Sequence, residues 1–217
     1  MQKNLAAMLR VLRREVKQWK QPIVGTFAVG ENAPFKVFIS TVLSLRTKDK
    51  TTELASHRLF AAADTPEEML KLTIPQIEKL IFPVGFYHTK AKNILEICRV
   101  LMEKFDGVVP SDMDTLLMFK GVGRKTANLV LTVGYNQPGI CVDVHVHRIS
   151  NRWGMVKTKT PDETEMVLRK VLPRKYWIEY NDVLVCFGQN LCQPVSPFCS
   201  RCKIRKFCPR IGVGRSR

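Results

Sequence analysis

Apolar side chains recur at three- and four-residue spacing along most of the chain, which is the pattern of amphipathic helices. In residues 35–43 the repeat comprises Phe35, Phe38, Ile39, Val42 and Leu43. In residues 91–105 it comprises Ala91, Ile94, Leu95, Cys98, Leu101 and Phe105. A further helix is expected from about residue 175 to 189. No segment alternates regularly between apolar and polar residues as a strand does, so the pattern predicts an all-α fold.

Several predicted helices begin and end at residues with capping roles. Thr65-Pro66-Glu67-Glu68 and Thr160-Pro161-Asp162-Glu163 each supply an N-cap threonine, a proline at the first helical position and a glutamate for a capping box. Thr73 with Gln76 forms a third capping box. Asp106-Gly107 is expected to end the helix predicted at residues 91–105. The cluster Asn136-Gln137-Pro138-Gly139 predicts a turn that separates two helical regions.

The formal net charge of +16 indicates a polyanionic partner, because bound phosphate offsets the self-repulsion of so many cations. Residues 1–20 carry six basic side chains and one acid, Glu15, and no Asp or Glu follows Asp182. A basic but merely solvated surface is the alternative. No segment approaches the roughly 18 consecutive apolar residues of a membrane span, so we expect no membrane partner and a cytoplasmic location.

Four of the seven cysteines lie together near the end of the chain, as Cys192, Cys199, Cys202 and Cys208. Both zinc and a [4Fe–4S] cluster accept four thiolates. The spacing contains a single C-x2-C pair with wider arms, which favours the cluster over one tetrahedral zinc ion. The basic residues of this segment are expected to face DNA; they are Arg201, Lys203, Arg205 and Lys206.

The stretch GVGRKTAN at residues 121–128 combines a glycine turn with a cationic helix start. Gly121 and Gly123 are expected to adopt positive φ, so that the amides of Gly121, Val122, Gly123 and Arg124 point at a phosphate. A nucleotide-binding P-loop is excluded because Arg124 separates Gly123 from Lys125 and a helix precedes the turn. A plain turn between helices is the alternative. Lys125 is either a phosphate ligand or, with a pKa lowered by the helix end and Arg124, a nucleophile.

Three motifs together resemble the endonuclease III family of helix–hairpin–helix DNA glycosylases: GVGRKTAN, VDVHVHR at residues 142–148 and the C-x6-C-x2-C-x5-C tail. The match runs from about residue 25 to Cys208. It implies a six-helix barrel domain at residues 26–137, with the helix–hairpin–helix motif at about 113–133. It also implies a second helical domain, formed by residues 1–25 and 138–217, that holds a [4Fe–4S] cluster.

The resemblance further implies a monomeric base-excision-repair enzyme that acts on double-stranded DNA containing damaged bases or abasic sites, near the nucleoid in a prokaryote. Such an enzyme removes oxidised pyrimidines through a lysine Schiff base and cuts 3′ to the abasic site by β-elimination. The nucleophile would be Lys125 and the catalytic carboxylate Asp143, whose other role is that of a helix N-cap. Phe86 would enter the gap left by a flipped base, unless it is an ordinary packing residue. His88 and Lys90 would touch phosphate.

Three departures from the family pattern bear on substrate preference and DNA contact. Arg46 stands where relatives commonly carry a glutamine that fills the emptied base stack, and Phe119-Lys120 replaces a common Leu-Pro pair. The segment Gln193–Phe198 contains no basic residue, whereas relatives often place cations there. Two other functions fit the sequence: a mismatch-directed glycosylase of the same fold, or a non-catalytic iron–sulfur DNA-binding protein.

Overall fold

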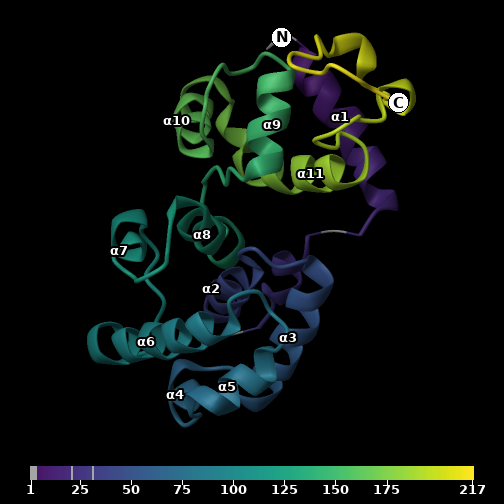
Figure 1. Cartoon of the computed structure of the whole chain (residues 1–217). Helices are drawn as coiled ribbons and strands as arrows, with labels where there is room; N and C mark the ends of the chain where they lie inside the picture. The colour runs from purple at the N-terminus through teal and green to yellow at the C-terminus, as the bar shows by residue number, and fades with distance from the viewer. Residues whose placement is uncertain (1–3, 21, 31) are drawn as a thin grey trace. The chain divides into compact units, whose positions relative to one another are not determined.

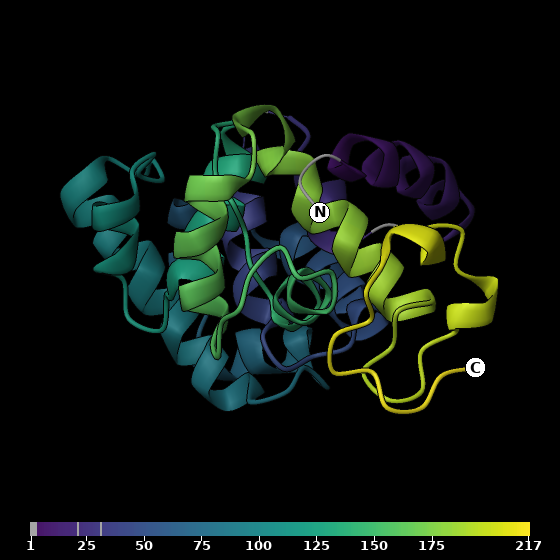
Figure 2. The same ribbon diagram turned by 90° about the horizontal axis from the view of Figure 1, so that it is seen from above.

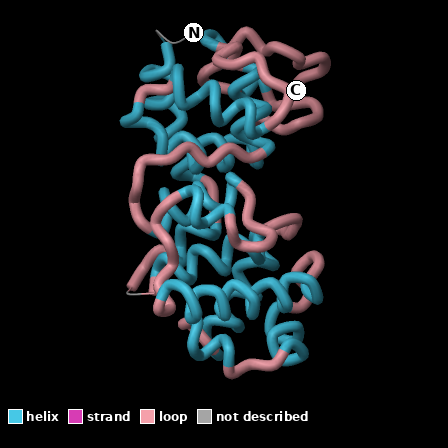
Figure 3. Tube along the Cα trace, turned by 90° about the vertical axis from the view of Figure 1, so that its left-hand side faces the viewer, coloured by secondary structure: helices cyan, strands magenta, loops and turns pink. Residues whose placement is uncertain are grey.

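The computed structural model describes residues 4–20, 22–30 and 32–217, and within these ranges it consists of helices and loops without a strand (Figures 1 and 3). The predicted all-α class is therefore confirmed. The chain divides into two compact units. We call Ile23–Gly139 the central unit, and Met1–Pro22 with Ile140–Arg217 the terminal unit. The division between Gly139 and Ile140 directly follows the predicted turn cluster.

The central unit packs its helices around α2, which is Ala33–Ser44. The other helices are α3 (Asp49–Ala62), α4 (Pro66–Leu70), α5 (Ile74–Ile81), α6 (Tyr87–Phe105), α7 (Met113–Leu117) and α8 (Arg124–Leu129). Phe38, Ile39 and Leu43 of α2 are completely buried in the core of this unit. Helix α8 continues into a π-helical turn at Val130–Gly134, and this turn also packs against α2. The apolar stripe predicted for residues 35–43 is thus the face that organises the unit.

Local capping explains where several helices begin and end. The hydroxyls of Thr65, Thr73 and Thr160 each accept a hydrogen bond from the backbone amide three residues later. Thr73 and Gln76 form the reciprocal capping box that the sequence predicts. Helix α6 ends at Asp106-Gly107, where both residues have positive φ and the Gly107 amide donates to the Leu101 carbonyl.

The terminal unit is built from both ends of the chain (Figures 1 and 2). Its helices are α1 (Leu5–Glu15), α9 (Val144–Arg152), α10 (Pro161–Val171) and α11 (Trp177–Asn190). Helix α11 packs against α9 and α1. The buried rings of Trp153 and Tyr180 meet edge to face, with 6.4 Å between the ring centres. Among the described residues, no helix has the length and apolar character needed to span a membrane.

Candidate functional site

The glycine turn before α8 uses its two glycines differently. Gly121 has φ +80°, a conformation that only glycine adopts at little cost. Gly123 is the N-cap of α8 and is extended, at φ −104° and ψ 176°, so the expected positive φ at this residue is wrong. The amide of Val122 donates to the Phe119 carbonyl, and the Val122 side chain is buried in the core. Val122 therefore closes the turn and does not present its amide outward.

Lys125 is the second residue of α8 and lies in the first helical turn, as the sequence predicts. The next residues of the helix, Thr126, Ala127 and Asn128, are buried, whereas Lys125 itself is half-buried. The Asn128 side-chain amide donates to the Arg124 carbonyl at 3.0 Å and so ties the first turn of the helix together. This packing holds the backbone of Lys125 in place at the start of α8.

Asp143 is the N-cap of α9 in the terminal unit. Its Oδ1 atom accepts hydrogen bonds from the amides of His145 at 2.8 Å and Val146 at 2.9 Å. The three apolar residues before it, Ile140, Cys141 and Val142, are buried, and Asp143 is only 8% exposed. The carboxylate is thus held in one orientation by the start of the helix that it caps.

Arg46 and Phe86 lie next to each other on the surface of the central unit. The Arg46 guanidinium carbon stands 5.6 Å from the centre of the Phe86 ring, and Phe86 is 62% exposed. Both residues have positive φ, at +53° and +58°, which is uncommon for residues other than glycine. A Cβ atom on Gly85 would lie 2.7 Å from the Arg46 carbonyl oxygen, so this close approach requires glycine. Most of the Phe86 side chain therefore lies outside the core of the central unit.

Lys90 is buried, in contrast to the predicted phosphate contact. Its ammonium donates to the carbonyls of Leu43 at 2.8 Å and Leu45 at 2.6 Å, and to the Thr47 hydroxyl at 3.1 Å. Burial lowers the pKa of Lys90 to about 8. These internal bonds occupy the ammonium, so Lys90 leaves the set of DNA-contacting residues and instead anchors the turn after α2. His88 is exposed and contacts Glu78 through Nδ1 at 2.8 Å.

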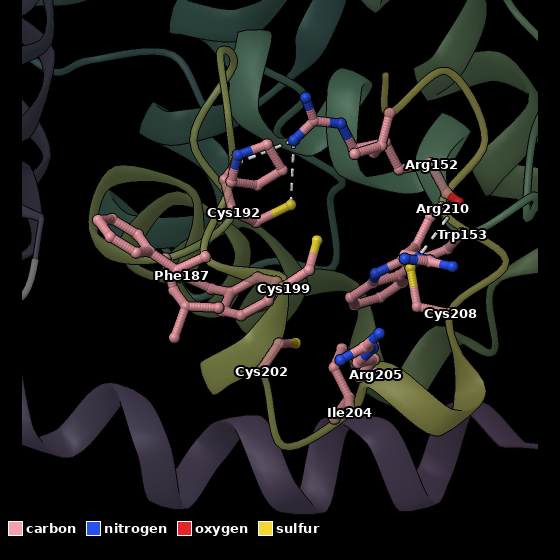
Figure 4. A pocket seen from close by; sticks show the side chains of 14 residues that line it. Arg152, Trp153, Phe187, Cys192, Cys199, Cys202, Ile204, Arg205, Cys208 and Arg210 are labelled. Carbon is pink, nitrogen blue, oxygen red and sulfur yellow. Dashed lines mark hydrogen bonds between the residues drawn. The ribbon is translucent and has the colours of Figure 1, made fainter. Parts of the chain in front are cut away.

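The four clustered cysteines border one hollow in the terminal unit (Figure 4). Apolar residues complete its wall, among them Trp153, Phe187, Leu191 and Ile204. Within the described part of the chain, no three His, Cys, Asp or Glu side chains are grouped as one metal ion requires. Burial raises the pKa of Cys202 to about 11 and also raises those of Cys192 and Cys208. Burial therefore favours the neutral form of these thiols, and a metal that bound them would have to displace their protons.

Two arginines of α9 hold the loop that carries the first of these cysteines. Arg152 donates to the Cys192 sulfur at 3.3 Å (Figure 4). It also donates to the carbonyls of Gln193 and Pro194, each at 2.7 Å. Arg148 donates to the Cys192 carbonyl at 2.9 Å. Neither arginine is predicted from the sequence as a site residue. The signal in the sequence was their four-residue spacing, which places both arginines on one face of the helix. Their acceptors lie some forty residues later in the chain.

The basic residues between Cys199 and Cys208 are all exposed, as the charge pattern predicts; they are Arg201, Lys203, Arg205 and Lys206. Lys203 is paired with Glu15 of α1 at 2.5 Å. The guanidinium of Arg201 lies over the ring of Phe198, with 5.4 Å from its carbon to the ring centre. The ammonium of Lys206 lies over the ring of Phe207 at 4.9 Å. The segment is therefore a cationic surface, and two of its basic side chains, Arg201 and Lys206, lie over aromatic rings.

Comparisons with known proteins identify relatives of the whole arrangement. Residues 39–174 match the HhH-GPD superfamily base excision DNA repair protein family. Endonuclease III of Thermotoga maritima is 49% identical over 178 residues, which cover 82% of this chain and 84% of that protein. A solved structure of a trapped endonuclease III–DNA covalent intermediate superimposes with a TM-score of 0.85 at 31% identity, covering 97% of this chain and 96% of that one. A thermostable thymine-DNA glycosylase, at 22% identity and a TM-score of 0.73 over 94% of this chain and 98% of that chain, shares the fold.

Proposed function

The chain belongs to the endonuclease III family within the HhH-GPD superfamily of base excision DNA repair proteins, and we propose that Lys125 and Asp143 carry its DNA glycosylase and AP lyase chemistry. The observation that carries this assignment is the position of Lys125, on a rigid first helical turn directly after the glycine hairpin. The substrate is double-stranded DNA with an oxidised pyrimidine or an abasic site. The target nucleotide must leave the base stack before its sugar can react.

The reaction begins when the neutral amine of Lys125 attacks C1′ of the flipped nucleotide. The C1′–N bond to the base breaks and the base departs with the electron pair. The sugar ring then opens as one proton of the amine passes by way of Asp143 to O4′, which leaves a protonated Schiff base between Lys125 and C1′. Asp143 accepts a proton from the amine and stabilises the positive charge that develops on the sugar. Loss of a C2′ proton then expels the 3′ phosphate by β-elimination. Water finally hydrolyses the Schiff base and regenerates Lys125.

Gly123 supports a backbone contact between the hairpin and DNA. Its extended conformation does not require glycine, and a Cβ atom built there meets nothing within 4 Å of the chain itself. The missing side chain at this N-cap leaves room for an external group to approach the backbone closely. We assign this group as a backbone phosphate, which Gly121, Gly123 and Arg124 contact without reading sequence.

Arg46 and Phe86 form the part of the central unit that enters the duplex in this proposal. An exposed aromatic ring stacks on bases, so Phe86 is suited to fill the gap left by a flipped nucleotide. Arg46 lies against that ring and offers five N–H donors to the orphaned base. A mismatch-directed activity is the second candidate function, because an arginine here can bond to opposite bases that a glutamine would not favour.

The proposed cofactor is a [4Fe–4S] cluster held by Cys192, Cys199, Cys202 and Cys208. A single zinc ion would gather its sulfur ligands at about 2.3 Å from one point. The unequal spacing of the four cysteines, with one C-x2-C pair and wider arms, favours a body with separated corners over one ion. When bound, the cluster supplies structural cross-links between the thiolates. Arg152 joins this loop to α9, whose first turn Asp143 caps, so loop and carboxylate are connected through one helix.

Covalent trapping tests the catalytic assignment. Borohydride reduces a Schiff base to a stable bond, so incubation with duplex DNA that contains an abasic site is expected to give a covalent protein–DNA adduct. Lys125→Gln abolishes the adduct, whereas the matched control Lys120→Gln, at an exposed lysine beside the same turn, retains it. An unchanged adduct in Lys125→Gln, or no adduct from wild-type protein that binds this DNA, contradicts the assignment.

A further inference from the structure

Residues 210–217 fold back on the loop that joins the first two clustered cysteines (Figure 2). We call these residues the strap. At its start the Ile211 amide donates to the Arg152 carbonyl at 3.0 Å. At its end the Arg217 amide donates to the Pro197 carbonyl, and the Ser200 amide donates to the Arg217 carbonyl, each at 2.8 Å. Both ends of the strap are thus bonded to the protein around the cysteine hollow.

The side chain of Arg217 is fixed as well as its backbone. Its Nε donates to the Ser196 carbonyl at 3.0 Å, and its Nη2 donates to Gln193 Oε1 at 2.9 Å. The guanidinium carbon lies 3.8 Å from the centre of the Phe198 ring, which is close stacking. A guanidinium has five N–H donors, and these two bonds use two of them. Arg217 is therefore held in one pose with donor capacity that the loop does not use.

A second guanidinium, that of Arg201, lies over the same Phe198 ring, with 5.4 Å from its carbon to the ring centre. Two like charges on one side chain repel each other, and an acidic neighbour would ordinarily offset that repulsion. No Asp or Glu follows Asp182 in the sequence, and within the described residues neither Arg201 nor Arg217 forms an ion pair. Lys203 differs, because Glu15 neutralises it. The guanidinium groups of Arg201 and Arg217 therefore have the chemistry of a site that would bind an anion.

We propose that Arg201 and Arg217, gathered on Phe198, form a binding site for the phosphate backbone of DNA; the inference rests on the proposed function. Guanidinium groups match phosphate oxygens in bidentate geometry, and the aromatic support fixes the plane of each fork. The loop from residue 193 to 198 contains no lysine or arginine of its own. The strap supplies a cation to this loop from a different part of the chain.

Salt-dependent DNA binding tests the site with the full-length chain. The probe is a duplex that carries a tetrahydrofuran analogue of an abasic site, and the variants are Arg217→Gln and the matched control Arg215→Gln. Arg215 lies in the same strap and is exposed, and among the described residues none of the hydrogen bonds to the loop comes from its side chain. Arg217→Gln is expected to weaken binding about fivefold to tenfold at moderate salt. The slope of log affinity against log salt should fall in magnitude by about 0.9, as for one lost phosphate contact.

Arg215→Gln is expected to change affinity less than about twofold and to leave the slope unchanged, and Arg201→Gln with Arg217→Gln should lower the slope by about 1.8. Equal effects of Arg217→Gln and Arg215→Gln, or no effect of either, would overturn the site. The covalent trapping yield of the control Arg215→Gln at saturating enzyme should equal that of wild type. Wild-type protein that traps DNA but shows no Arg217 effect refutes the strap site alone, whereas failure of wild type to trap refutes the proposed function.

Discussion

Replacement of the buried Lys90 by methionine gives a stability change whose pH dependence follows from the structure. The ammonium makes three internal hydrogen bonds, at 2.6, 2.8 and 3.1 Å, to the turn that follows α2. Three bonds from a charged donor contribute roughly 4–5 kcal/mol at about 1.5 kcal/mol each. Burial offsets about 3 kcal/mol of this, because the pKa of Lys90 falls from 10.5 to about 8. Lys90→Met should therefore lower the free energy of unfolding by about 1–2 kcal/mol at pH 7.

The same pKa shift fixes how this difference changes with pH. Between pH 8 and 10.5 the unfolded chain holds the Lys90 proton while the folded chain has lost it, so wild-type stability rises with pH in this window. Lys90→Met lacks the titrating group. The gap in unfolding free energy between wild type and Lys90→Met should therefore widen by about 3 kcal/mol from pH 8 to pH 10.5.

Thiol labelling of Cys98 in urea measures this gap for the central unit. Cys98 is the one cysteine between residues 23 and 139, and it is completely buried on α6. Its labelling rate, corrected for the reactivity of a free thiol at each pH, tracks the opening of this unit. The control is Lys92→Met, an exposed lysine of the same helix, which should stay within about 0.5 kcal/mol of wild type at every pH. A gap that stays constant or narrows from pH 8 to pH 10.5 would refute the reasoning.

Substitutions at two further residues separate structure from chemistry in the terminal unit. Asp143→Asn keeps an N-cap oxygen and should alter stability by less than about 0.5 kcal/mol, whereas Asp143→Ala should cost about 1 kcal/mol. Both should lower single-turnover excision by roughly 10²–10³-fold, and near-normal excision by Asp143→Asn would refute a catalytic carboxylate. Arg152→Met removes the bonds to the Cys192 loop and should speed loss of visible iron–sulfur absorbance in denaturant, with Arg215→Met as an exposed control. A colourless wild-type protein that contains zinc would contradict the cluster assignment.

The helices and their caps were predictable because they depend on residues close together in sequence. Thr73 and Gln76 meet within one turn, and the apolar stripe from Phe35 to Leu43 needs no knowledge of its partners. The helix expected at residues 175–189 is observed as α11, at Trp177–Asn190. The positions of Lys125 at a helix start and of Asp143 after a buried segment follow from the same local rules.

The contacts that the sequence did not reveal are all long-range. Lys90 follows the spacing of a surface residue beside an apolar stripe, yet its acceptors lie more than forty residues earlier in the chain. Arg152 reaches Gln193 across 41 residues, and Arg217 reaches Gln193 across 24 residues. Gly123 differs again, because residue type alone does not tell a glycine needed for positive φ from one that leaves room beside it.

The composition of the terminal unit from both ends of the chain sets the order in which a newly made chain can fold. Ile23–Gly139 is one continuous segment, so the central unit has all its residues long before synthesis is complete. Helix α1 is made first, but its partner α11 begins at Trp177, and at about 5–20 residues per second the delay is roughly 10–30 s. During that interval the apolar face of α1, with Leu5, Met8, Leu9 and Leu12, has no α11 to cover it. This face therefore lacks its native partner until α11 has been synthesised.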